Sequence, residues 1–249
     1  MGLIGGGGSI LSVPVLVYLF HYDAVTATAY SLFIVGITSL FGSVGFMKNK
    51  QVNFRTALMF GIPSILGVLF SRRIVLPHLP HYIIHRWGIT LTKETFLLLL
   101  FSILMIISSY KMIKKINEHK LFKSQDTNFT LLVSQGLLVG IITGLIGAGG
   151  GFLIVPALVM LLKINMKEAV ATSLFIIALN SLIGFTSSLD SVLVDWQFLL
   201  TFASLSISGI LVGVLLSKKI EGKKLKPIFG WVVLVMGIYV ILRETIFQS

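Results

Sequence analysis

The stretch Gly144-Leu-Ile-Gly-Ala-Gly-Gly-Gly151 occurs in this chain twice. Its other copy, Gly2-Leu-Ile-Gly-Gly-Gly-Gly-Ser9, lies 142 residues earlier, and both copies lead to the same dipeptide, Val13-Pro14 and Val155-Pro156. With that offset held, 22 of the 53 residue pairs from Gly2 to Phe54 are identical. A repeat of this length predicts that the chain folds as two copies of one structural unit.

The repeat continues and sets the predicted domain boundaries. After a four-residue slip, Gly67-Val-Leu-Phe-Ser-Arg-Arg-Ile74 aligns with Gly213-Val-Leu-Leu-Ser-Lys-Lys-Ile220. The one long polar stretch begins at Lys111 and ends at Asp126, where two halves must join. We therefore expect a first transmembrane repeat over 1–113, a charged connector over 114–126 and a second repeat over 127–249.

Composition places both repeats in a membrane. The 249 residues are 55% hydrophobic and only 12% charged, and the stretch from Asn128 to Leu162 carries no formal charge over 35 residues. About 20 helical residues cross a hydrocarbon core of about 30 Å, and an open chain can satisfy its backbone there only as helix. We expect an all-α polytopic membrane protein. The predicted spans are 24–46, 55–75, 93–113, 166–188, 195–217 and 226–243, with a further helix at 128–144 and short helices at 10–20 and 152–163.

Charge counting favours inverted repeats. If each Gly-rich region dips into the membrane and returns on the same side, 15 of the 20 Lys and Arg residues lie on one side and 5 on the other. A full crossing by each Gly-rich region would divide them about evenly, against the usual positive-inside bias. Three crossings per half invert the second half relative to the first. Each repeat is thus predicted to hold a Gly-rich broken, re-entrant helix plus three transmembrane helices. The first copy has no counterpart of 128–144, so either the chain begins inside its first helix or the halves differ.

Several classes of function are not expected. The chain has no cysteine, which excludes disulfides and thiolate metal sites. The net charge of +11 comes from Lys and Arg in short loops, as membrane topology requires, so nucleic acid is not an expected partner. His78, His81 and His85 have helical spacing but no nearby carboxylate, so we expect no metal site. No acid, base and nucleophile cluster in any span, so we expect neither an enzyme nor a cofactor.

The glycine runs are the first candidate site. Each glycine costs about 1 kcal/mol relative to alanine inside a helix, and irregular backbone at membrane depth persists only where protein or a wet cavity surrounds it. Each run precedes a short helix with proline in or near its first turn, whose free amides and dipole favour an anion. The alternative is that the glycines only allow close helix packing. The candidates are Gly5, Gly6, Gly7, Gly8, Ser9 and Pro14 in one copy and Gly147, Gly149, Gly150, Gly151 and Pro156 in the other.

Polar residues on the following spans are the second candidate site. They are Ser31, Thr38 and Ser39 in the first copy and Ser173, Asn180 and Ser181 in the second. Spacings of seven and eight keep each set on one helix face, where neutral donors could orient a desolvated anion. The alternative is ordinary hydrogen bonding to their own helix backbone or between helices. For Asn180 a use is expected, because an amide in mid-membrane is costly otherwise.

These motifs resemble the TauE/SafE family of membrane transport proteins. The resemblance rests on the doubled glycine motif with its Val-Pro pair and on Ser31-Leu-Phe-Ile34 and Ser173-Leu-Phe-Ile176, and it covers nearly the whole chain. It implies transport of sulfur-containing anions such as sulfite and organosulfonates across the bacterial inner membrane. Members of that family usually have a helix before the first glycine run, whereas here Met1 stands almost on it.

We therefore expect a multi-pass secondary transporter of the inner membrane. It would move a small anion, a sulfur oxyanion or organosulfonate, by alternating exposure of a site between the two glycine loops. A passive anion channel or an uptake permease for a different small anion remains the alternative, and a membrane-embedded enzyme or scaffold would show no solute flux. Beyond the solute and the lipid bilayer, the sequence leaves a homodimer open.

Overall fold

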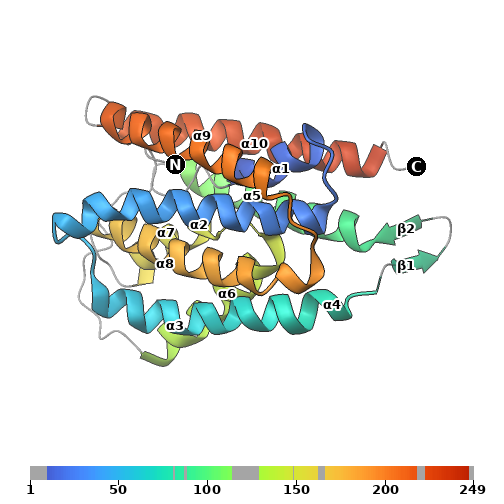
Figure 1. The fold of residues 1–249 in the computed structure, drawn as a ribbon, viewed down its shortest axis with the longest axis horizontal. Helices are drawn as coiled ribbons and strands as arrows, with labels where there is room; N and C mark the ends of the chain where they lie inside the picture. Colours follow the sequence, from blue (N-terminus) through green and yellow to red (C-terminus); the bar gives the residue numbers. More distant parts are fainter. Residues whose placement is uncertain are drawn as a thin grey trace.

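The computed structural model describes residues 10–80, 82–86, 89–113, 129–147, 149–161, 166–217 and 222–246. Helices make up nearly all of this part of the chain (Figure 1). The α-helices are α1 (Ser12–Tyr18), α2 (Ala24–Lys48), α3 (Phe54–Phe70), α4 (Leu76–His78), α5 (Lys93–Ile113), α6 (Phe129–Ile146), α7 (Gly151–Leu161), α8 (Met166–Thr186), α9 (Trp196–Ser217) and α10 (Gly222–Ile246). A π-helical turn, η2 (Ser71–Val75), joins α3 to α4, and a 3-10 turn, η4 (Leu189–Ser191), follows α8.

The helix bounds agree with the predicted spans to within about a turn. Among the described residues, four helical segments are long and apolar enough to cross a membrane: Ala24–Lys48, Phe54–His78, Lys93–Tyr110 and Glu168–Ser191. The all-helical prediction holds except at one hairpin, in which β1 (Tyr82–Arg86) pairs antiparallel with β2 (Ile89–Thr92). His78 ends α4 and His85 lies in β1, so these two histidines do not share a helix despite their spacing in the sequence.

Side-chain caps explain where several helices begin. The Asp23 carboxylate accepts a hydrogen bond from the Thr26 amide at 2.8 Å at the start of α2. Asn53 Oδ1 accepts from the Thr56 amide at 3.0 Å at the start of α3, and Asp195 does the same for α9. Asp and Asn are preferred at this position because their oxygens satisfy amides that the first helical turn leaves free.

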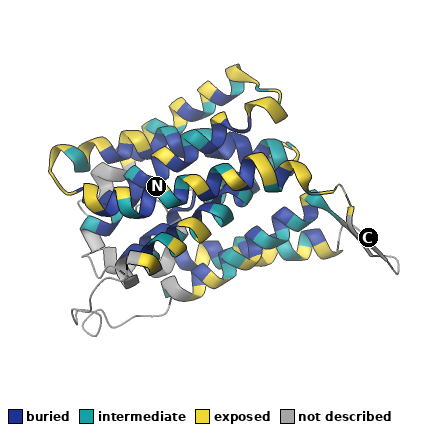
Figure 2. Cartoon of the chain, turned by 90° about the horizontal axis from the view of Figure 1, so that it is seen from below, coloured by how far each residue is buried: buried dark blue, intermediate teal, exposed yellow. Residues whose placement is uncertain are grey.

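The outer face of α3 carries an apolar stripe. Phe54, Leu58, Ile62, Leu66, Phe70 and Ile74 recur every four residues, and each is about half exposed. Buried residues instead occupy the faces turned toward the other helices (Figure 2). An exposed apolar stripe along the whole span is expected where lipid rather than water surrounds the helix.

The centre of the bundle is a crossing between α2 and α8, the equivalent helices of the two sequence copies. A Cβ atom built on Gly42 would contact Leu174, and one built on Gly184 would meet Leu32, so each copy's glycine faces the other copy's leucine. Gly36 in turn faces Leu182. As the numbers rise along α2 they fall along α8, so the two helices run antiparallel (Figure 1).

Two further helix pairs surround this crossing. Helix α3 packs along both α6 and α8, while α5 packs along α10. One apolar cluster joins Ile10 near α1 to Phe101 and Met105 of α5 and Val233 and Val240 of α10. Helix α9 is attached to α2 through Tyr30, whose hydroxyl oxygen accepts a hydrogen bond from the Asp195 amide at 2.6 Å.

Candidate functional site

The second glycine loop is non-helical, as predicted. Gly147, Gly149 and Gly150 have φ angles of 71°, 64° and 73°, which lie in the left-handed region that favours glycine. A Cβ on Gly147 would lie 2.4 Å from the Thr28 Cβ, and one on Gly150 would lie 2.2 Å from the Thr143 Cγ2. Both the backbone conformation and the close neighbours therefore require glycine in this loop.

The loop lies in the interior of the bundle, between α6 and α7. A Cβ on Gly149 would lie 2.4 Å from Val35 Cγ1 and 2.8 Å from Ser181 Oγ. Val35 and Ser181 lie near the middle of the spans that α2 and α8 form. Helix α7 begins at Gly151, so its first-turn amides start beside this loop, as expected. Pro156 is the sixth residue of α7, so in this copy the proline lies near the first turn rather than within it.

The predicted polar residues separate into two groups. Ser31, Ser39 and Ser181 are fully buried, and their hydroxyls have no hydrogen-bond partner in the described part of the chain. Thr38 and Ser173 instead donate to backbone carbonyls of their own helices, at 2.7 Å to Ile34 and 2.9 Å to Val170. For these two residues the structure favours the alternative of local backbone bonding.

The antiparallel crossing decides which of these residues lie close together. Ser31 neighbours Leu32, which packs on Gly184 near the end of α8, while Ser173 neighbours Leu174, which packs on Gly42 near the end of α2. Ser31 and Ser173 therefore lie at opposite ends of the crossing. Gly149 and Ser181 come together near its middle.

A cavity of about 370 Å³ lies beside the first copy. Thr38 contributes to its wall from α2, Ser12 from the start of α1, and Ser206 and Gly209 from α9. Pro14 is buried within α1. The predicted loop residues Gly5, Gly6, Gly7, Gly8 and Ser9, which precede this helix, lie outside the described residues.

A second cavity, of about 290 Å³, has the wrong charge for an anion. Asp23, Glu94 and Glu244 line it together with Arg243. Glu244 accepts a hydrogen bond from the Tyr18 hydroxyl at 3.0 Å, and the Arg243 guanidinium stacks on the Tyr18 ring at 4.3 Å. Burial, followed by the nearby Tyr30 and Asp195, raises the pKa of Tyr22 in this wall, so its phenol stays protonated. Within the described residues, no group of three His, Cys, Asp or Glu side chains could hold a metal ion.

Asn180 forms an interhelical hydrogen bond that the sequence did not reveal. Its Nδ2 donates to Ser64 Oγ of α3 at 2.6 Å, while its Oδ1 is buried and has no partner among the described residues. Ser71 and Arg72 lie in the same helical span as Ser64, Phe54–His78. Both are buried, and each has polar side-chain atoms without a hydrogen-bond partner among the described residues. Charge counting offers one hint of Arg72, because the predicted topology puts it on the side that holds only 5 of the 20 Lys and Arg residues.

The Ser64–Asn180 bond yields a prediction about stability. We expect Ser64→Ala to lower the free energy of unfolding by about 1 kcal/mol, because hydrogen bonds between membrane helices contribute about 0.6 kcal/mol on average and up to about 1.7. The check is a double-mutant cycle with Asn180→Ala, measured by unfolding in detergent micelles. A coupling energy of zero would show that the contact does not stabilise the fold.

Comparisons with known proteins agree with this architecture. Residues 1–240 match the family model described as sulfite exporter TauE/SafE. The chain is 28% identical over 254 residues to the probable membrane transporter protein MJ0441 of Methanocaldococcus jannaschii, an alignment that covers 96% of this chain and 90% of that one. It is 29% identical over 255 residues to the probable membrane transporter protein YunE of Bacillus subtilis, covering 94% and 90%. No solved structure matches the chain.

A multi-pass bundle of apolar helices around buried polar groups and a broken glycine segment is the architecture of a membrane transporter. The match over 1–240 makes the assignment specific, and this chain belongs to the TauE/SafE family of membrane transporters. The names of its relatives describe transporters rather than enzymes.

Proposed function

We propose that this protein is a secondary transporter that moves a small anion, a sulfur oxyanion or organosulfonate, across the inner membrane by alternating access. The observation that carries the proposal is the position of Gly149, next to the unpartnered Ser181 hydroxyl and near the middle of two spans. Left-handed glycines and a helix N-terminus supply backbone amides, and buried hydroxyls supply neutral donors. Such groups bind a desolvated anion without a fixed charge.

In this proposal, the two inverted repeats give the protein its two states, one with the site open to each side of the membrane. The antiparallel packing of the equivalent helices α2 and α8, with matched glycine and leucine contacts, supports that arrangement. Helices α6 and α3 run side by side, since Gly136 faces Phe60 and Gly144 faces Val68. Helix α7 then returns, because its Leu158 packs in one cluster with Leu132 at the beginning of α6. These contacts support a re-entrant hairpin, in which the segment from α6 to α7 enters and leaves at one end of the bundle.

Binding of a panel of anions to the purified protein tests this function. The panel holds sulfite, sulfate, thiosulfate, a small alkanesulfonate, acetate and chloride, and the readout is the melting temperature. We expect a selective rise with one sulfur oxyanion, since a ligand at a hundredfold excess over its Kd stabilises the native state by about 2.7 kcal/mol. Melting temperatures unchanged by every anion would contradict the proposal.

Two other transport modes would use the same loop. Transport rates distinguish a channel from the proposed carrier, and the anion panel distinguishes an uptake permease. A passive channel would conduct anions at rates far above carrier turnover and would not couple the exit of internal solute to the entry of external solute. An uptake permease for a different small anion would respond to another member of the panel. The position of the Gly149 loop, deep between the packed helices α2 and α8, favours a carrier.

A further inference from the structure

Arg72 is a buried cation within an otherwise neutral part of the bundle. It lies in the π-helical turn η2, and its side chain is 2% exposed. In the span Phe54–His78 it stands about 27 Å along the helix from one end and about 9 Å from the other. A charged side chain at such a depth is costly, and π-helical turns within longer helices often mark functional sites.

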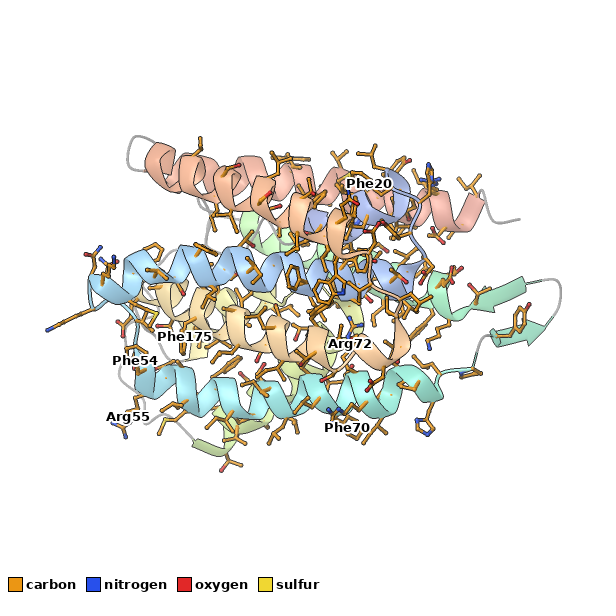
Figure 3. All side chains as sticks on the ribbon, in the orientation of Figure 1. Phe20, Phe54, Arg55, Phe70, Arg72 and Phe175 are labelled. Atoms are coloured by element: carbon orange, nitrogen blue, oxygen red, sulfur yellow. The ribbon has the colours of Figure 1, made fainter. Side chains whose placement is uncertain are left out.

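The guanidinium of Arg72 has donors to spare. Its Nη1 donates to Ser188 Oγ at 3.4 Å, while Nε and Nη2 have no hydrogen-bond partner in the described part of the chain. No carboxylate among the described residues forms an ion pair with it. Its neighbour Arg73 is exposed, and Arg55 at the far end of α3 points away from the bundle, whereas Arg72 lies between α3 and α8 (Figure 3).

The place of Arg72 in the fold connects it to the glycine loop. Arg72 meets Ser188 and Ser64 meets Asn180, and in both pairs the residues are 116 positions apart, so α3 and α8 run parallel and in register. Between these two polar contacts the helices approach closely at Gly184, whose Cβ would lie 2.9 Å from Val68. We call this line of contacts the α3–α8 seam. Asn180 is followed by Ser181, which touches the loop at Gly149, so the seam leads from the loop to Arg72.

A second contact links the residue before Arg72 to the glycine motif that the two sequence copies share. Ser71, the preceding residue, is fully buried, and its Oγ has no partner in the described residues. A Cβ on Gly144, the first residue of the second glycine motif, would lie 3.0 Å from this Oγ. The motif thus begins against the same π-helical turn that carries the guanidinium.

We propose that Arg72 is a binding residue for the transported anion, at a step between the Gly149 loop and the end of the bundle where η4 lies. This inference rests on the proposed function and adds the charge that the predicted neutral site lacks. The Nε–H and one Nη2–H of a guanidinium point in the same direction and form a fork that matches two oxygens of one anion. The fork therefore favours oxyanions with two adjacent oxygens, such as sulfite, a sulfonate or a carboxylate, over a spherical halide.

Three variants test the assignment. Arg72→Gln removes the charge and keeps a polar side chain. Arg72→Lys keeps the charge but not the fork. Arg73→Gln removes one exposed charge from the next position and is the matched control. Affinities for sulfite, methanesulfonate and chloride are measured by calorimetry on the purified protein. We expect Arg72→Gln to weaken the binding of both oxyanions about tenfold to a hundredfold, the size of effect typical of a charge-assisted hydrogen bond.

The conservative variant gives the sharper readout. Arg72→Lys should fold because it retains the charge, should bind chloride as the wild type does, and should lose most of its preference for the two oxyanions over chloride. Arg73→Gln should match the wild type throughout. Wild-type preference in Arg72→Lys together with wild-type oxyanion affinity in Arg72→Gln would overturn the assignment and leave the proposed function standing. A wild-type protein that binds none of the three anions would instead overturn both.

Discussion

Anion transport by the Gly149→Val variant is expected to fall to background. The Cβ of any side chain at this position would lie 2.4 Å from Val35 Cγ1 and 2.8 Å from Ser181 Oγ, far inside normal contact distance. The φ of 64° adds strain for a β-branched residue. The loop must therefore move away from α2 and α8, and the site between them is lost. The measurement is flux into proteoliposomes, normalised to the amount of inserted protein.

A control variant tests whether a side chain added at any glycine of the bundle would also abolish transport. Gly45 lies in α2, and a Cβ there would meet nothing within 4 Å. Gly45→Ala should transport normally and should be slightly more stable, since alanine is favoured over glycine in a helix by about 1 kcal/mol. Normal flux in Gly149→Val would show that the glycine loop is not part of the anion-binding site.

Gly140→Ala is expected to have the largest effect on stability. Its Cβ would lie 2.0 Å from the Ser64 carbonyl oxygen and 2.7 Å from the Ser64 carbonyl carbon, both of which belong to the backbone and cannot rotate away. In the reciprocal contact, a Cβ built on Gly67 would lie 2.3 Å from the Leu137 carbonyl oxygen. Helices α3 and α6 must therefore separate, and overpacking of this kind costs about 3 kcal/mol.

Unfolding in detergent micelles measures this loss, with Gly209→Ala as its control. Gly209 lies in α9, where an added Cβ meets nothing within 4 Å, so that substitution should leave the unfolding midpoint nearly unchanged. Equal midpoints for Gly140→Ala and the wild type would mean that α3 and α6 do not pack as closely as described. Gly67→Ala should behave like Gly140→Ala because it opens the same interface.

The spans could be predicted because hydrophobic length in a membrane leaves helix as the only choice. Helix α5 begins and ends at the predicted residues, and α2 ends within two residues of its predicted end. The β1–β2 hairpin and the turn η2 could not be predicted. Neither has a hydrophobic period of its own, and the π-helical turn lies against α6, where a Cβ on Gly144 would meet Ser71.

The candidate site could be predicted in part, because the internal repeat selected several of its residues. The repeat identified Gly149 and Ser181 as candidates, and the structure brings the loop that holds Gly149 against Ser181 of α8. The same alignment also selected Ser31 and Ser173, which the crossing places far apart. Arg72 and Ser64 were missed because their role comes from a register between α3 and α8 that no repeat encodes.

Counterflow in proteoliposomes tests the central claim most directly. Vesicles holding the wild-type protein are loaded with unlabelled sulfite and diluted into a trace of labelled sulfite, with empty vesicles and Gly149→Val vesicles alongside. The account predicts a transient accumulation of label above its equilibrium level in the wild-type vesicles alone, which is how a carrier with an alternating site behaves. Label that never exceeds equilibrium, or that accumulates equally with Gly149→Val, would contradict it.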